Sequence, residues 1–354
     1  MTRKLIGLTV AIFFLSGVAG LFAQEKVSPL SNYQYSKKDL PQYEGIKKEA
    51  DVQKRADLLA AFQKEHPISK LLFYVANDYM ACVKPQLDSK DWAKAASMIE
   101  GFRALVPTTK AVQDAGIPEG VEEFLKDQLL PTQKLFLGAL AGVYYQAQNW
   151  PKAAEMVEKV YELAPDKALL PQMADIYLRY DVEKYLTCAK KIITEYPIEQ
   201  SYATAIQMAQ VYGQKKDANA AIEMFSKVMD VYGDKVPPNV PEAQWNVTRA
   251  VAYGAIAGSV YGKKDYPKAL ELYEKVLKLD PKREDAYYYI GMSRWQSNNS
   301  EGAIEPFAKC VVLNQSLAKR AQQYLEQIYK ARHNDSLNGL DQVLAKAKSD
   351  LGIN

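Results

Sequence analysis

The sequence has little of the side-chain chemistry on which metal sites and disulfide frameworks depend. Its 354 residues include two histidines, His66 and His333, and three cysteines, Cys82, Cys188 and Cys310. Two distant histidines cannot form a histidine-rich metal site, and no two cysteines have the spacing of zinc ligands. Three scattered cysteines do not make a disulfide framework. Since each lies in an apolar helical stretch, we expect a buried thiol; the alternative is a reactive or intermolecular thiol.

Charge of one sign is also lacking. The chain has 45 Lys and Arg against 42 Asp and Glu, a formal net charge of +3. Such a balance gives no broad electrostatic attraction to nucleic acid or to an anionic membrane. A hydrophobic fraction of 48% with 25% charged residues is typical of folded proteins and excludes global disorder. We therefore predict a folded protein that does not bind nucleic acid.

Catalytic motifs are absent as well. The sequence has no Gly-x-Ser-x-Gly turn, no phosphate-binding glycine loop and no His-Glu-x-x-His helix. His66 and His333 fall where helices are expected to end, and there a cation is favoured by the helix dipole. Adjacent carboxylates such as Glu122 and Glu123 point in different directions on a helix. We therefore predict no catalytic residue, no cofactor and no metal, and a protein that is not an enzyme.

The amino-terminal residues have the pattern of a targeting segment. Arg3 and Lys4 precede an uncharged apolar run from Leu5 to Phe22, and Ala23 offers a cleavage point. We predict a signal peptide over 1–23; the alternative is an uncleaved anchor, because the run is just long enough to span a bilayer. The protein is then exported, and periplasmic, envelope-associated or secreted. Its one membrane contact would be this segment, if uncleaved. Residues 24–41 have few large aliphatic side chains and are predicted to be a flexible leader.

The rest of the chain shows apolar residues three and four apart, the periodicity of amphipathic helices, and almost no strand-like alternation. One heptapeptide, Asn-Trp-Pro-Lys-Ala-Ala-Glu at 149–155, recurs as Asp-Tyr-Pro-Lys-Ala-Leu-Glu at 265–271 and more distantly at 89–96. Each copy opens a helix whose end is marked by a proline, at Pro165, Pro281 and Pro107 respectively. The sequence therefore contains an internal repeat.

This pattern resembles the tetratricopeptide repeat family, in which a period of about 34 residues holds two antiparallel helices. One unit has Leu140-Ala141, Tyr144, Trp150, Ala153, Val157 and Pro165 at the family's positions; similar units lie at 208–225, 256–281 and 287–315, with degenerate ones at 72–107 and 173–192. The resemblance implies an all-α, right-handed solenoid of antiparallel helix pairs; a chance helical bundle is the alternative. Small residues should let paired helices approach closely, at Ala141, Ala153, Ala209, Ala221, Ala257, Ala269, Gly291 and Ala303.

The repeats also suggest how the chain is organised. We predict an N-terminal helical region with a degenerate repeat at 42–130, repeats at 131–315 with an insertion at 236–253, and capping helices within 316–354. In the insertion we expect a loop at 236–240 and a long helix from Glu242; the connector at 101–131 should hold a short helix near 121–129. The closing helices are expected at 316–330 and 336–351, with charges such as Lys319 and Arg320 forming a polar cap.

The resemblance also implies that the first helix of each pair lines a concave, partner-binding face. Some family members hold a peptide's terminal carboxylate there with Lys, Arg and Asn, but here Gly, Tyr, Gln and Met occupy those positions, so we predict no such clamp. An aromatic groove suits an apolar or extended peptide. The predicted partner-binding residues are Tyr145, Gln210, Gln214, Tyr261, Tyr288, Tyr289, Met292, Trp295 and Gln296. The alternative is that Tyr261, Tyr288 and Tyr289 are core between repeats; for Trp295 we favour exposure.

The function that these inferences favour is a non-catalytic scaffold or adaptor for protein–protein interaction in a bacterial cell envelope. Its groove would hold a peptide or a partner helix. One alternative is a structural accessory subunit of a secretion, pilus or outer-membrane assembly machine. Another is a ligand-binding or enzymatic pocket between the broken segments at 101–131 or 236–253.

Overall fold

The computed structural model describes residues 39–115 and 120–353, and this part of the chain is helical with no β-strand. The chain divides into two compact units, here called unit 1 (up to Ile192) and unit 2 (from Ile193). The predicted signal peptide, most of the leader, and residues 116–119 of the connector lie outside the described residues. Residues 39–41, at the end of the predicted leader, belong to a helix. Within the described ranges, no helix has an apolar stretch long enough to cross a membrane.

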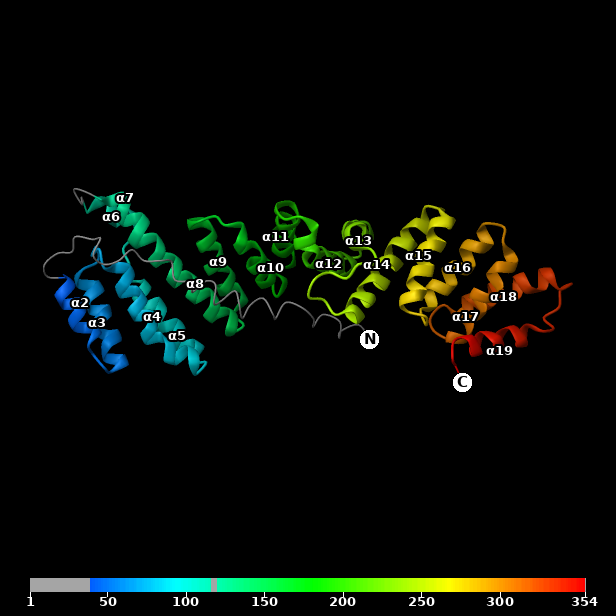
Figure 1. Ribbon diagram of the computed structural model, residues 1–354, viewed down its shortest axis with the longest axis horizontal. Coiled ribbons are helices and arrows are strands. Elements are labelled where there is room, and N and C mark those ends of the chain that lie inside the picture. The colour runs from blue at the N-terminus through cyan, green and yellow to red at the C-terminus, as the bar shows by residue number, and fades with distance from the viewer. Residues whose placement is uncertain (1–38, 116–119, 354) are drawn as a thin grey trace. The chain divides into compact units, whose positions relative to one another are not determined.

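Unit 1 is a succession of helices that are joined mostly by short turns (Figure 1). They are α2 (Asp39–Lys47), α3 (Val52–Glu65), α4 (Leu72–Asp88), α5 (Trp92–Arg103), α6 (Thr109–Asp114), α7 (Val121–Phe124), α8 (Leu130–Gln146), α9 (Trp150–Leu163), α10 (Leu170–Leu178) and α11 (Val182–Glu195). A π-helical turn, Leu125–Leu129, joins α7 to α8 without a break. The predicted short helix near 121–129 is thus confirmed as the first part of a longer helical stretch.

Unit 2 continues with longer and more regular pairs (Figure 1). Its helices are α12 (Ile198–Gln214), α13 (Ala218–Tyr232), α14 (Glu242–Gly262), α15 (Tyr266–Leu279), α16 (Glu284–Gln296), α17 (Ser300–Leu313), α18 (Ala318–Arg332) and α19 (Leu340–Asp350). Helices α12 and α13, α14 and α15, and α16 and α17 pack as pairs, and α18 and α19 both pack on α17. The long helix from Glu242 and the two closing helices were predicted correctly.

Five of the turns between paired helices share one local structure. A residue in the left-handed backbone region, such as Lys264 at φ 64°, ends the first helix. The next residue, here Asp265, accepts a hydrogen bond from the backbone N–H of Lys268 and caps the second helix. The same arrangement occurs at Asp91, Asn149, Asp217 and Asn299. The repeated Asp or Asn in the sequence is therefore the helix cap that fixes each turn.

Small residues let the paired helices touch, as the sequence predicts. Gly291 and all seven alanines of the predicted set are buried. The contact is closest at Gly291 on α16, where an added β-carbon would lie 2.8 Å from the ring of Phe307 on α17. Only a residue without a side chain lets these two helices pack at this distance.

The three cysteines are part of the core. Cys82, Cys188 and Cys310 are all free and buried. Burial raises the pKa of Cys188 to about 11, and the pKa of Cys310 to about 12. The prediction of buried thiols is confirmed, and the two raised pKa values make these thiols weak nucleophiles.

Candidate functional site: an aromatic face on unit 2

Four half-buried aromatic residues lie on successive first helices of unit 2, and we call them the aromatic strip. They are Tyr261 on α14, Tyr289 and Trp295 on α16, and Tyr324 on α18. The ring centroids of Tyr261 and Tyr289 are 5.0 Å apart, and those of Trp295 and Tyr324 are 5.1 Å apart. The buried ring of Tyr288 connects the two pairs, at 5.3 Å from Tyr289 and 6.3 Å from Tyr324.

A buried aromatic layer supports the strip from below. Tyr273 of α15 stacks on Tyr289 with the ring centroids 5.4 Å apart, and Phe307 of α17 stacks on Tyr324 at 5.7 Å. Tyr273 and Phe307 are 2% and 0% exposed, so these second-helix rings cannot move aside. Offset and edge contacts of this kind favour a fixed ring geometry. The exposed edges of the strip are therefore held by the packing of both helix layers.

The polar atoms of the strip have no partner within the protein. Neither the hydroxyls of Tyr261, Tyr289 and Tyr324 nor the indole N–H of Trp295 makes a hydrogen bond to any described residue, and none is sealed from solvent. Several tyrosines elsewhere donate their hydroxyl to internal acceptors, among them Tyr43, Tyr79, Tyr144, Tyr177, Tyr232, Tyr287 and Tyr329, whereas others such as Tyr161 and Tyr180 do not. The strip thus combines apolar ring surface with free hydrogen-bonding groups, a combination common at protein interfaces.

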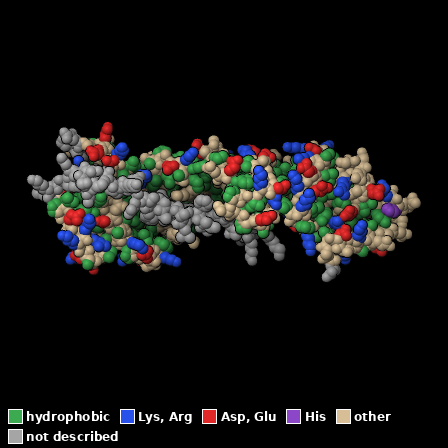
Figure 2. Space-filling view, in the orientation of Figure 1, with side chains coloured by type: hydrophobic (Ala, Val, Ile, Leu, Met, Phe, Trp, Pro, Cys, Tyr) green, Lys and Arg blue, Asp and Glu red, His purple; other side chains and the backbone are tan. Residues whose placement is uncertain are grey.

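The charged groups beside the strip are mostly basic. Arg320, exposed on the first turn of α18, places its guanidinium carbon 5.9 Å from the centre of the Tyr288 ring. Lys263 and Lys264 follow Tyr261 at the end of α14 and are also exposed. Arg294 on α16 is partly neutralised by Glu274, 3.7 Å away. Over the face drawn in Figure 2, basic and acidic side chains are interspersed.

Unit 1 has an aromatic group at the corresponding repeat position, but its polar atoms are used internally. Tyr145 on α8 donates its hydroxyl to Asp175 of α10 at 2.8 Å. Arg179 pairs with the same carboxylate at 3.3 Å and lies 5.0 Å from the Trp150 ring centre. Burial, with the Asp175 hydrogen bond adding to it, raises the pKa of Tyr145 to about 12. Tyr145 therefore ties two repeats together.

The predicted partner-binding residues do not all fall on one surface. Tyr261, Tyr289 and Trp295 lie on the strip, and exposed Gln296 adjoins it in sequence. Gln210 and Gln214 are exposed on α12, in the preceding pair, while Tyr145 belongs to unit 1.

Two of the predicted residues need correction. Tyr288 and Met292 are 4% and 9% exposed and belong to the core, because α17 and α18 pack over this side of α16. For Tyr288 the alternative of an inter-repeat core residue is thus the right one.

Tyr324 and Arg320 also belong to this site, although the sequence pattern predicts only a polar cap for α18. The two residues are four positions apart and therefore lie on one side of that helix. The pairing of an aromatic and a basic residue at this spacing is the sequence signal that predicts them.

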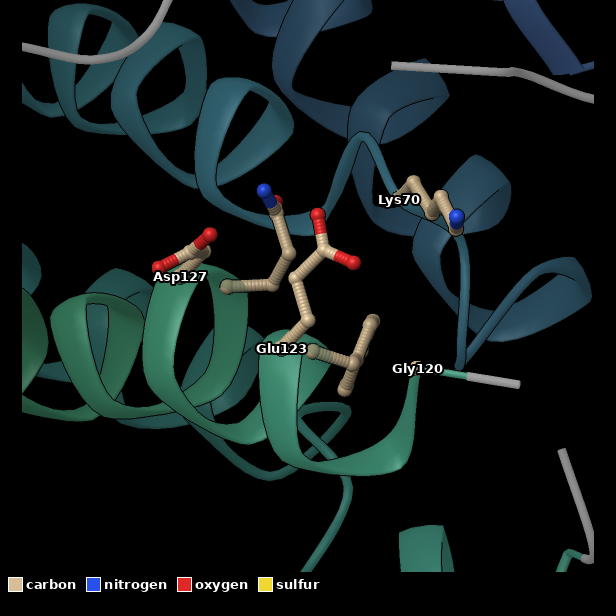
Figure 3. Close-up of a pocket in the computed structure, with 6 residues that line it drawn as sticks. Lys70, Gly120, Glu123 and Asp127 are labelled. Carbon is tan, nitrogen blue, oxygen red and sulfur yellow. The ribbon is translucent and has the colours of Figure 1, made fainter. Parts of the chain in front are cut away.

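The hollow shown in Figure 3 lies elsewhere, in unit 1, beside the connector. Lys70, Glu123 and Asp127 line it, and its cavity volume is about 10 Å³, room for no more than a water molecule. Small-molecule pockets are typically larger, at roughly 300–1,000 Å³. In the described parts of the chain, no three His, Cys, Asp or Glu residues are grouped to hold a metal ion.

Both histidines have structural partners at helix ends. His66 caps α3 and lies 3.3 Å from Asp39, which ties α2 to α3. His333 caps α18 and stacks on Tyr329 with a centroid distance of 3.8 Å. The prediction that each histidine sits at a helix end is confirmed.

Comparison with known proteins supports the repeat class. Residues 257–318, from the middle of α14 to the start of α18, match the family described as tetratricopeptide repeat. The described residues outside this match also form consecutive packed helix pairs with no β-strand. Arrays of this kind offer extended surfaces on which other molecules bind. A search of curated proteins finds no match.

Several solved structures are similar to this chain at low identity. The TPR2AB domain of yeast Sti1, solved as a pHSP90 complex, is 14% identical and covers 88% of this chain and 97% of its own, with a TM-score of 0.34. A tetratricopeptide repeat protein from Parabacteroides merdae is 13% identical, with coverages of 82% and 97% and a TM-score of 0.31. The C-terminal part of a repeat protein from Cytophaga hutchinsonii is 16% identical, with coverages of 71% and 97% and a TM-score of 0.33.

Proposed function

We propose that this protein is a non-catalytic interaction scaffold or adaptor of the cell envelope, and that it binds an extended segment of a partner protein on the aromatic strip. The observation that supports this proposal is the set of unused polar atoms on half-buried rings. Tyr261, Tyr289, Trp295 and Tyr324 hold ring surface and hydrogen-bonding groups toward solvent at fixed positions. Tyrosine and tryptophan of this kind give large contact area at little cost in side-chain entropy.

The dimensions of the strip suit an extended peptide. Packed helices lie about 8–10 Å apart, so a strip on the three first helices α14, α16 and α18 is on the order of 20 Å long. An extended chain advances about 3.3 Å per residue, so roughly six residues would cover the strip. The backbone N–H and C=O groups of such a peptide are unpaired, and the free hydroxyls and the indole N–H can bind them.

The envelope location is the second part of the proposal. It is supported by the basic start and uncharged run within residues 1–23. The buried thiols Cys188 and Cys310, whose pKa values are raised to about 11 and about 12, are compatible with an oxidising compartment. Mass spectrometry of the protein from envelope fractions tests this: a mature chain that begins near Gln24 supports export with cleavage. An intact chain recovered from the cytosol contradicts the proposal.

The binding proposal is tested by selection from a random peptide library displayed on phage, with the whole chain as bait. Selected peptides are then synthesised, and their Kd is measured by fluorescence anisotropy. Trp295→Ala should raise the Kd roughly 30-fold, the loss of about 2 kcal/mol that is typical of a binding hot spot. Trp92→Ala is the matched control, because Trp92 is also half-buried but lies in unit 1.

Circular dichroism of both variants should show unchanged helix content. If no peptide is enriched over the library background, or if both tryptophan variants weaken binding equally, the strip is not the binding site. Loss of helix content in Trp295→Ala alone would mean that Trp295 serves the core.

A further inference from the structure

Arg320 is an arginine without an acidic partner at the edge of the aromatic strip. It stands one helical turn before Tyr324 on α18, so the two side chains share a side of the helix. Its guanidinium lies over Tyr288 at 5.9 Å from the ring centre, and it makes no ion pair or hydrogen bond with any residue that the structure describes. A cation over an aromatic ring is held in place but keeps its hydrogen-bond donors free.

The other arginines of unit 2 are all paired. Arg249 contacts Asp234 at 3.1 Å, Arg283 contacts Asp285 at 2.7 Å, Arg294 contacts Glu274 at 3.7 Å and Arg332 contacts Glu301 at 2.7 Å. Within residues 193–353, Arg320 is therefore the one guanidinium without an acidic partner.

Two acidic groups on α16 and α18 accept hydrogen bonds from other donors. Glu284, one turn before Tyr288 on α16, accepts hydrogen bonds from the backbone N–H of Gln315 and Leu317. On α18 itself, the Glu326 carboxylate accepts from Gln322 at 2.8 Å. Lys263 and Lys264 add positive charge beyond Tyr261 at the other end of the strip. The strip is therefore apolar in the middle and positive at both ends.

Resting on the proposed function, we propose that the occupant of the strip is an extended peptide with a side-chain carboxylate two positions from a large apolar or aromatic residue. The carboxylate pairs with Arg320, and the apolar side chain lies against Trp295 and Tyr324. Alternate side chains of an extended chain point the same way about 6.6 Å apart, and packed helices lie about 8–10 Å apart. A peptide that crosses from α18 to α16 can therefore place a carboxylate at Arg320 and an apolar side chain at Trp295 two positions away. The motif is thus Asp or Glu, any residue, then an apolar residue, in either direction.

The peptide selection described above tests this proposal when it is read for sequence and charge. Peptides displayed at the amino terminus of a phage coat protein have no free carboxyl end, so enriched Asp or Glu reports a side-chain carboxylate. A selected peptide is then made with an amidated end, in its acidic form and with Asp→Asn or Glu→Gln.

Arg320→Gln should raise the Kd of the acidic peptide roughly fivefold, the upper range for an exposed ion pair. It should leave the Kd of the neutral peptide unchanged. Added salt should weaken binding of the acidic peptide to the unsubstituted chain but not to Arg320→Gln. Lys319→Gln, the adjacent exposed cation on α18, is the matched control and should change the Kd by less than about twofold.

Different failures separate this proposal from the one on which it rests. Peptides enriched without acidic residues, or an Arg320→Gln variant that binds like the unsubstituted chain, would overturn the charge pairing, even if Trp295→Ala still raised the Kd as predicted. Absence of any enriched peptide would overturn both. A dimer in sedimentation analysis that Trp295→Ala converts to monomer would identify a second copy as the occupant, and would also overturn the peptide proposal.

Discussion

The carboxylate of Glu284 accepts a hydrogen bond from the backbone amide of Leu317, 2.9 Å away. It also accepts from Gln315 N–H at 3.0 Å and from the Ser316 hydroxyl at 3.2 Å, and the residue is only 4% exposed. Glu284 begins α16, whereas the three donors form the turn before α18. One buried side chain therefore fixes the start of α18 against α16, and with it the position of Tyr324 relative to Trp295.

Replacing Glu284 by glutamine should lower the free energy of unfolding of unit 2. The neutral amide loses the charge-assisted hydrogen bonds and turns an NH₂ group toward backbone donors, so we expect a loss of about 2–3 kcal/mol. Urea unfolding followed by circular dichroism measures this change. Glu301→Gln is the control: its partner is Arg332 and its side chain is 76% exposed, so its loss should stay below about 1 kcal/mol. Equal losses in the two variants would contradict a fixing role for Glu284.

The contact between Gly291 and Phe307 predicts opposite effects for two glycine substitutions. In Gly291→Ala, the new methyl group would lie 2.8 Å from the Phe307 ring, which is fully buried. We expect a net loss of about 1–2 kcal/mol, because overpacking outweighs the better helix propensity of alanine.

The control for this prediction is Gly213→Ala on α12, where an added β-carbon would meet nothing within 4 Å. It should gain a few tenths to about 1 kcal/mol from helix propensity alone. Thermal and urea unfolding of both variants check the signs. If Gly291→Ala were as stable as the unsubstituted chain, the close approach of α16 and α17 would not be a packing requirement.

The helix pairs and their turns could be predicted from the sequence because their determinants are local. Asp265 and Asn299 are helix-capping residues that predict where a helix begins. Ala269 and Gly291 are small residues that predict where paired helices touch, and all four recur at the same positions of the repeat. The repeat pattern also predicts Trp295 as a partner-binding residue, because it lies near the end of the first helix of its pair. Short-range periodicity therefore carries most of the fold and part of the candidate site.

The rest of the site depends on contacts that the pattern does not contain. Tyr288 and Met292 were expected on a surface, but α17 and α18 cover them, and that packing is set by residues far along the chain. Tyr145 finds its acceptor on Asp175, 30 residues away. In the sequence, Arg320 has the pattern of a surface charge on a capping helix. Only the structure shows that it has no acidic partner among the described residues. The chemistry of these side chains follows from tertiary neighbours, which one sequence does not reveal.

The Tyr145–Asp175 hydrogen bond gives a prediction of pH dependence. Burial, together with Asp175, raises the pKa of the Tyr145 phenol to about 12, whereas tyrosine in an unfolded chain titrates near pH 10. The folded state thus favours the protonated phenol. Its stabilising contribution is complete below about pH 10 and is lost as the pH rises toward 12. Tyr144 beside Glu100 shifts the same way, to about 12, with burial as the main cause, so unit 1 should unfold more readily across this range.

Tyr145→Phe tests this contribution directly. At pH 7 it leaves Asp175, which is 6% exposed, without its phenol donor, so we expect a loss of about 1–2 kcal/mol in the free energy of unfolding. Between pH 10 and 12 the urea midpoint of the variant should fall less steeply than that of the unsubstituted chain, because one raised phenol pKa has been removed. Tyr161→Phe is the control at pH 7, since that hydroxyl has no partner in the described structure, and its loss should be below about 0.5 kcal/mol. Identical pH slopes for Tyr145→Phe and the unsubstituted chain would show that the Tyr145 phenol does not drive the alkaline loss of stability.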